Sequence, residues 1–142
     1  MLKKPTGTHP QHHDQLTSQE IAKTLSSALA QEIKGSADEA AVFYNLSHLD
    51  TKLNALKTAF PKNTLHAIAV KANPVVALLK RIQIAGHGAE VASMGELNLA
   101  FKAGFSADSI IYDSPVKTQD ELEVALKAGV LINANTLEEL TV

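Results

Sequence analysis

The residue with the clearest chemical potential in this chain is Lys71. It lies in the run His66-Ala-Ile-Ala-Val-Lys-Ala-Asn-Pro74, where a short apolar stretch ends at the lysine and a predicted helix begins directly after it. A lysine at the mouth of a buried strand loses part of its water, which favours the neutral amine over the ammonium ion. A neutral amine is a nucleophile and forms a Schiff base with an aldehyde. Residue type alone favours a simpler interpretation, in which the lysine only extends its charged end into solvent.

Length and composition are those of one ordinary globular domain and exclude several classes of function. The 142 residues are 45% hydrophobic and carry a formal net charge of −2. This charge gives no electrostatic basis for binding nucleic acid or an anionic membrane. The sequence has no apolar run of about 18 residues and no secretory signal, so we expect a cytoplasmic location. It has no cysteine, which excludes disulfides and thiol catalysis within these residues.

The polar segment 1–15 is predicted to be a disordered tail. It contains His9, His12 and His13, and because no further ligands accompany them we expect no metal site. Segment 16–40 is predicted to be an N-terminal helix and a linker. The helix covers 17–33 and begins with a capping box.

A regular alternation of strands and helices occupies the rest of the chain. A strand at 41–44 and a helix capped by Ser47 come first, and four strand–helix units follow. The four strands are predicted at 65–70, 89–92, 109–112 and 130–134. Their ends recur at intervals of 22, 21 and 22 residues, at Lys71, Ser93, Ser114 and Thr136.

Units of this length connect parallel strands by right-handed crossovers. Equal spacing favours a (β/α)₈ barrel over a doubly wound sheet, and no Gly-x-Gly-x-x-Gly follows any strand. A barrel needs eight strands and about 250 residues. We therefore predict an α/β fold in which residues 41–142 form the first half of a (β/α)₈ TIM barrel.

Four segments, in order, resemble the motifs of one enzyme family. Ala69-Val-Lys-Ala-Asn-Pro74 is similar to the cofactor-lysine motif of the fold-type III pyridoxal-phosphate enzymes. These are alanine-racemase-like barrels that include diaminopimelate, ornithine and arginine decarboxylases. The segments that resemble the second, third and fourth barrel strands are Gly88–Leu97, Ile110–Thr118 and Ile132–Leu140. The resemblance covers about residues 38–142 and favours the diaminopimelate decarboxylase branch.

The resemblance implies that Lys71 holds pyridoxal 5'-phosphate as a Schiff base and helps to return a proton after an amino-acid substrate loses carbon dioxide. Ala69 would leave space for the cofactor. Glu90 stands where the family usually has aspartate, near the cofactor ring. The alternative is a strand carboxylate that faces a lysine. The resemblance also implies a homodimer for the complete enzyme, with no nucleic-acid or membrane partner.

Other polar residues have simpler interpretations. Ser93 and Glu96 are predicted to cap a helix rather than to act in catalysis. Lys117 either meets an anion near the strand ends or is a solvated loop lysine. His87 is expected in a surface turn, and His66 is assigned no role because it starts a strand at the end opposite the chemistry.

The resemblance places the phosphate-binding glycine loop and the substrate-binding cysteine and tyrosine of the family outside these residues. We therefore expect an N-terminal fragment of a decarboxylase, most like diaminopimelate decarboxylase, that is inactive alone. Glu90 and the loop 114–117 depart from the usual pattern. They keep open a siderophore-pathway or an ornithine/arginine-type decarboxylase. A non-catalytic, regulatory pyridoxal-phosphate-binding homologue is the alternative from another class. A racemase is less favoured by the motif at 91–97.

Overall fold

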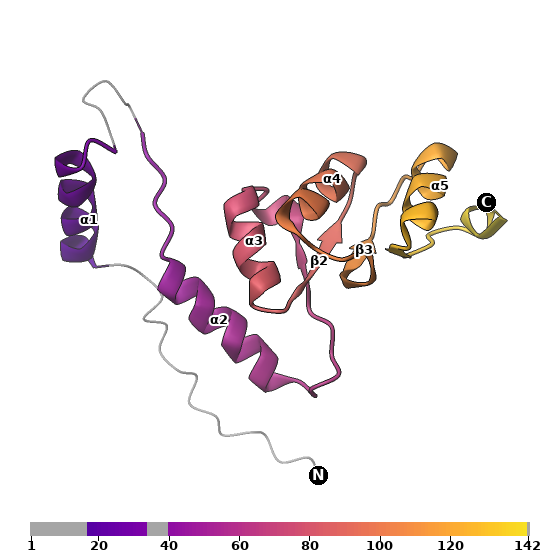
Figure 1. Ribbon diagram of the computed structural model, residues 1–142, viewed down its shortest axis with the longest axis horizontal. Helices are drawn as coiled ribbons and strands as arrows, with labels where there is room; N and C mark the ends of the chain where they lie inside the picture. The colour runs from indigo at the N-terminus through magenta and orange to yellow at the C-terminus, as the bar shows by residue number, and fades with distance from the viewer. Residues whose placement is uncertain (1–16, 34–39, 142) are drawn as a thin grey trace, which may run out of the picture. The chain divides into compact units, whose positions relative to one another are not determined.

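The computed structural model describes residues 17–33 and 40–141 (Figure 1). The predicted tail at 1–15, with its three histidines, lies outside the described residues. Contacts divide the chain into two units, Met1–Tyr44 and Asn45–Val142. In the described ranges, no helix has both the length and the apolar character needed to cross a bilayer. The division at 15/16 and 40/41 stays a prediction.

The first unit contains helix α1, Ser18–Ala30. Its predicted capping box is confirmed, because the Thr17 hydroxyl accepts from the Glu20 amide while the Glu20 carboxylate accepts from the Thr17 amide. The helix ends three residues before the predicted end. The strand predicted at 41–44 is wrong, since residues 40–45 form neither helix nor strand. In the described part of the chain, the sheet contains no strand that pairs with this segment.

The second unit is a parallel sheet with helices between its strands. The strands are β1 Ala67–Ala69, β2 Gly88–Val91, β3 Ile110–Tyr112 and β4 Leu131–Ile132. The helices are α2 Leu46–Ala59, α3 Val76–Ile84, α4 Met94–Ala103 and α5 Gln119–Ala128. The sheet order is β1-β2-β3-β4 and every pair is parallel. The predicted succession of parallel strands connected by helices is confirmed for these four strands.

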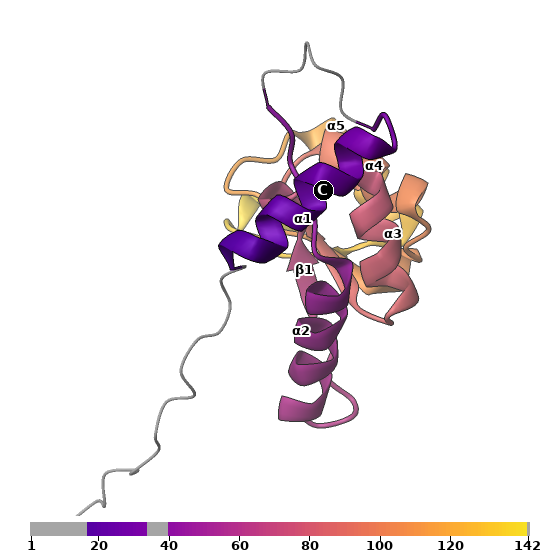
Figure 2. The same ribbon diagram turned by 90° about the vertical axis from the view of Figure 1, so that its left-hand side faces the viewer.

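The two faces of the sheet differ in burial. Helices α3, α4 and α5 follow one another along the sheet, and α3 lies against α4 in both views (Figures 1 and 2). Alternate strand residues face these helices and are fully buried: Ala89, Val91, Ile110 and Tyr112. The residues between them are less buried. One row of this second set joins Ala69, Glu90, Ile111 and Leu131, which pair in register. This row lies on the face that the helices leave uncovered.

Glycine sets two features of this scaffold. Helix α4 ends at Gly104, whose φ of 96° lies in the left-handed region that side chains disfavour. Gly88 begins β2 where another segment comes very close, because a Cβ atom there would lie 2.5 Å from the Ser109 carbonyl oxygen. The close pairing of β2 with the segment that leads into β3 therefore requires glycine.

Helix α2 is fixed to the carboxyl-terminal half of α3 by polar contacts. The Arg81 guanidinium donates two hydrogen bonds to the Asp50 carboxylate, at 2.7 and 2.5 Å. The helix is capped by Asn45, whose side-chain oxygen accepts from the His48 amide at 3.0 Å, rather than by the predicted Ser47. The ammonium group of Lys57 also donates to the carbonyl of Ala85.

Candidate functional site

Lys71 lies immediately after β1, in a single 3₁₀ turn. Val70 beside it is fully buried and anchors this turn in the core. The amide of Asn73 donates to the Val70 carbonyl at 3.0 Å, and the Asn73 side chain accepts from the Val75 amide at 3.3 Å. The chain therefore turns sharply at the end of β1 and enters α3. This turn leaves Lys71 at the carboxyl edge of the sheet.

The three predicted site residues come together at this edge. Ala69 ends β1 and pairs in register with Glu90 of β2. The Nζ atom of Lys71 lies 3.5 Å from Oε1 of Glu90. The amine therefore extends across the end of β1 toward the neighbouring strand.

The predicted desolvation of Lys71 is wrong for the described residues. The side chain of Lys71 is 63% exposed, whereas that of Glu90 is 17% exposed. Strand β1 has a neighbour on one side only in the described part of the chain, so no second strand covers the amine. An exposed amine is accessible to an aldehyde in solution. The geometry thus supports attachment of an aldehyde but not the expected low-dielectric environment.

Two residues that the sequence analysis did not single out occupy equivalent positions at the same edge. The amide of Asp113 donates to the Val91 carbonyl at 2.8 Å, and the amide of Asn133 donates to the Tyr112 carbonyl at 3.0 Å. These bonds continue the ladder one step beyond β3 and β4. Asp113 lies two residues after Ile111 and Asn133 two residues after Leu131, just as Lys71 lies two residues after Ala69. Both residues are exposed. Their common offset of two residues from Ala69, Ile111 and Leu131 becomes visible only with the strand register, which the sequence alone does not give.

Ser93 and Glu96 act as a helix cap, as predicted. The Ser93 hydroxyl accepts from the Glu96 amide at 3.2 Å, and the Glu96 carboxylate accepts from the Ala92 amide at 2.9 Å. Both side chains thereby satisfy amide groups at the start of α4. Helix α5 begins in the same way, with Thr118 and Glu121.

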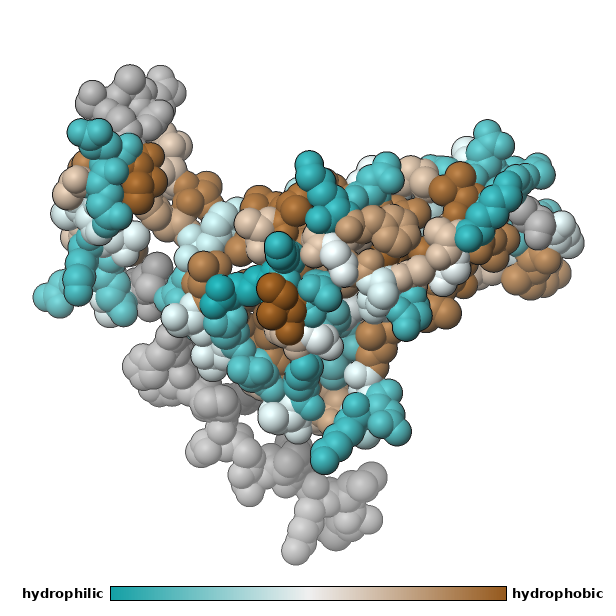
Figure 3. Space-filling view, in the orientation of Figure 1, coloured by the Kyte–Doolittle hydropathy of each residue, from teal (hydrophilic) through white to brown (hydrophobic). Residues whose placement is uncertain are grey.

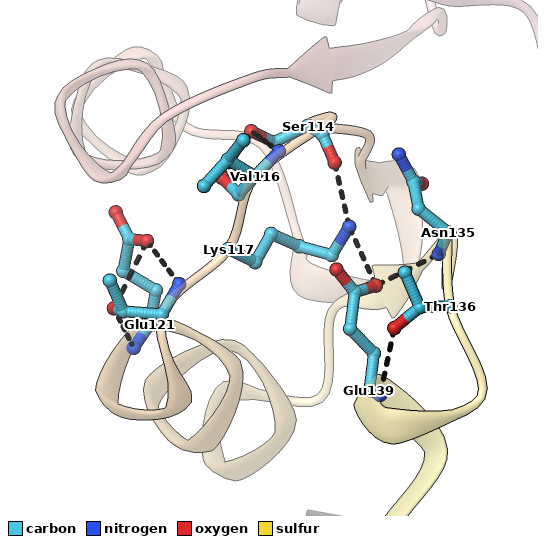
Figure 4. A network of polar contacts seen from close by, with 8 residues as sticks. Ser114, Val116, Lys117, Glu121, Asn135, Thr136 and Glu139 are labelled. Carbon is cyan, nitrogen blue, oxygen red and sulfur yellow. Dashed lines mark hydrogen bonds and ion pairs between the residues drawn. The ribbon is translucent and has the colours of Figure 1, made fainter.

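Lys117 is buried, so the alternative of a solvated loop lysine is wrong. No part of its side chain is exposed, and Nζ donates to the Ser114 carbonyl at 2.7 Å. The anion that it meets is the Glu139 carboxylate, 3.0 Å away (Figure 4). The Asn135 amide and the Lys117 ammonium hold the pKa of Glu139 below its ordinary value.

His87 is also buried, and the surface turn expected for it is wrong. It is 3% exposed because α2 covers it, and its Nε2 atom lies 3.1 Å from the Leu53 carbonyl oxygen. Burial lowers its pKa below the ordinary value. Its ring lies 5.8 Å from that of His66, at the amino end of the strands. No group of three or more potential metal ligands occurs in residues 17–33 and 40–141.

Comparison with known proteins identifies one family. Residues 46–142 match the family described as "Pyridoxal-dependent decarboxylase, pyridoxal binding domain". The chain is 41% identical over 92 residues to a diaminopimelate decarboxylase of Archaeoglobus fulgidus, a match that covers 65% of this chain and 22% of the relative. It is 47% identical over 74 residues to an L-glutamyl-[BtrI acyl-carrier protein] decarboxylase of Niallia circulans, covering 51% of this chain and 17% of the relative.

A solved structure agrees with these matches. The crystal structure of a diaminopimelate decarboxylase (I148L mutant) from Helicobacter pylori, complexed with L-lysine, is similar with a TM-score of 0.72 and 27% identity. The match covers 82% of this chain and 29% of that one. The chain thus spans less than a third of the length of each of these three proteins.

Proposed function

This chain belongs to the pyridoxal-dependent decarboxylases, since it matches their pyridoxal-binding domain, and from this premise we propose that it supplies the cofactor lysine of such an enzyme. The proposed reaction is the decarboxylation of meso-diaminopimelate to lysine. The observation that supports it most directly is the position of Lys71. Its amine lies at the carboxyl edge of a parallel sheet, which is where (β/α)₈ enzymes carry out their chemistry.

The residues at this edge suit a pyridoxal cofactor. Lys71 offers an exposed primary amine, the group that binds an aldehyde covalently. Ala69, next in register to Glu90, would leave room beside it, and the Glu90 carboxylate lies 3.5 Å from Nζ of Lys71, where it directs the amine. Pyridoxal phosphate, when bound, supplies the electron-withdrawing ring that accepts the electrons left after carbon dioxide departs. The Nζ atom of Lys71 would carry the proton that is returned after carbon dioxide leaves.

Reductive labelling tests the assignment of Lys71. The chain is incubated with pyridoxal phosphate and reduced with borohydride, and the labelled peptide is identified by mass spectrometry. We expect the label mainly on Lys71 and its loss in Lys71→Ala. Lys127→Ala is the matched control, because Lys127 is a more exposed lysine on α5 at 76%. Label spread evenly over the lysines would contradict the assignment.

A chimera separates the enzyme from its non-catalytic alternative. Residues 46–142 replace the matching segment of the Archaeoglobus fulgidus decarboxylase, and release of carbon dioxide is measured. We expect activity that Lys71→Ala abolishes. A chimera that binds the cofactor at Lys71 yet releases no carbon dioxide would favour a regulatory homologue instead.

The substrate has one specific alternative. The relatives in the comparisons include a decarboxylase that acts on a carrier-protein-bound glutamyl group as well as a diaminopimelate decarboxylase. Glu90 and the loop 114–117, which depart from the usual diaminopimelate pattern, make a siderophore-pathway or ornithine/arginine-type decarboxylase the second candidate. Assays of the full-length protein with diaminopimelate, ornithine and arginine distinguish them. A cytoplasmic homodimer is part of the same proposal and is supported by the family resemblance alone.

A further inference from the structure

The most extensively connected buried side chain near the candidate site is that of Lys117. It comes from the segment after β3, yet it reaches Glu139, which follows β4 (Figure 4). Glu139 also accepts from the Asn135 amide at 2.8 Å. Lys117 also donates a hydrogen bond to the backbone carbonyl of Ser114. The hydroxyl of Ser114 in turn donates to the backbone carbonyl of Val116 at 2.7 Å. One ammonium group therefore joins the loop 113–118 to the loop 133–137 through Glu139, which lies in the 3₁₀ helix directly after the second loop. We call this ion pair the edge clamp.

Helix capping alone does not require this clamp. The Glu139 carboxylate already accepts a backbone amide, and its own amide donates to Thr136 at 3.4 Å. The equivalent capping carboxylate at Glu96 bonds the Ala92 amide with no lysine beside it in the described contacts. An ammonium group removed from water is costly unless it is paired and hydrogen-bonded. Lys117 is both paired and hydrogen-bonded, which indicates that it has a role besides capping the helix.

The residues that this role would affect are the first residues of the two loops that the clamp joins. Asp113 opens the first loop and Asn133 opens the second, and both hold positions equivalent to that of Lys71 at the carboxyl edge. Neither residue belongs to a helix or strand that would fix its side chain. Loop position at this edge decides which polar groups face a bound ligand.

We propose that Lys117 is a positioning residue of the candidate decarboxylase site. Through its ion pair with Glu139 it fixes the two loops to each other, so that Asp113 and Asn133 are held at the same carboxyl edge of the sheet as Lys71, where they would contact polar groups of the bound cofactor. This inference rests on the function proposed above.

The test uses the whole chain and three variants. Lys117→Met removes the charge at similar length, and Lys117→Met with Glu139→Met removes both charges. Lys127→Met is the matched control, since it breaks the exposed ion pair of Lys127 with Glu123 at 2.9 Å on α5. Amide hydrogen exchange reports the loops, and thermal unfolding reports the fold. Cofactor binding is followed by the visible circular dichroism of pyridoxal phosphate attached to Lys71.

We expect Lys117→Met to accelerate exchange in both loops and to weaken cofactor binding by roughly tenfold, the effect of losing one charge-assisted hydrogen bond. The double variant should recover thermal stability, because it leaves no unpaired carboxylate at position 139. It should not recover the dichroism band of the bound cofactor. If Lys117→Met fails to fold, the double variant carries the same test. Recovery of both band and loop protection in the double variant, or equal losses in Lys127→Met, would overturn the proposal. If the unmodified chain takes no cofactor at Lys71, the proposed function fails, and exchange in the two loops alone tests the clamp.

Discussion

Lys71 and Glu90 meet because of strand register. Parallel pairing sets Glu90 opposite Ala69, and a slip of one residue would turn Glu90 toward the helices. The separation of 3.5 Å and the exposure of Lys71 make this a weak ion pair, so it adds little to stability. We expect the ion pair to orient the Lys71 amine rather than to stabilise the fold.

Glu90→Gln should therefore separate cofactor retention from stability. We expect the free energy of unfolding to change by less than about 0.5 kcal/mol. The borohydride-trapped label at Lys71 should decrease, because the carboxylate 3.5 Å away no longer directs the amine. Urea unfolding and peptide mapping measure the two quantities. Glu123→Gln, which breaks an exposed ion pair on α5, should leave the label unchanged. An undiminished label in Glu90→Gln would show that Glu90 is only a strand residue.

His87 should make stability depend on pH. Burial, the largest cause, lowers its pKa below the ordinary 6.5, so the unfolded chain takes up the proton first. Stability is then complete above about pH 6.5 and is lost as the pH falls from there toward the lower pKa of the folded state. Urea unfolding between about pH 7 and pH 5 measures this slope, and His87→Gln should flatten it. A variant with the slope of the unmodified chain would contradict this assignment.

Among the secondary-structure elements, the features that depend on residues close together in the sequence were predicted correctly at several places. The capping boxes that begin α1 and α5 were readable because both partners lie three residues apart. The strand–helix period also came from local hydrophobic spacing, and the four parallel strands confirm it. The site residues at Lys71 and Glu90 came from a family motif, and the structure places their side chains 3.5 Å apart.

What the sequence could not predict depends on segments distant in the chain. His87 is buried by Leu53 and its helix, 34 residues earlier. Lys117 is paired in the interior with Glu139, which lies beyond the next strand, β4. The strand at 41–44 was predicted from its apolar residues, but a strand also needs a neighbour to pair with. Asp113 and Asn133 became candidates only once the register of the strands was known.

Ser93→Ala tests whether Ser93 is only a cap. Loss of an N-cap hydroxyl costs about 1 kcal/mol of stability. We expect that decrease in urea unfolding, while the label at Lys71 per folded molecule stays constant. Ser93→Asp keeps a capping oxygen and should restore stability. A loss of label in Ser93→Asp, with stability intact, would instead give the hydroxyl a role in the site.

The second unit as a whole presents a sheet with open sides. In the described residues, β1 and β4 each pair on one side only, and the helices cover one face. On the uncovered row, Leu131 is 52% exposed. Unpaired strand edges and exposed apolar side chains favour association with another chain. On the face shown in Figure 3, by contrast, apolar residues lie among polar ones.

The chain should therefore associate through the uncovered face of its sheet as its concentration rises. Sedimentation velocity over a concentration series measures the average mass, which we expect to increase. Leu131→Lys should reduce this association, because it places a charge on the row that becomes buried. Leu126→Lys is a close control, since Leu126 is also 52% exposed but lies on α5, on the outside of the helices. Equal effects of the two substitutions would assign the association to general surface hydrophobicity, and a constant mass at all concentrations would show that the open sheet does not bind a second copy.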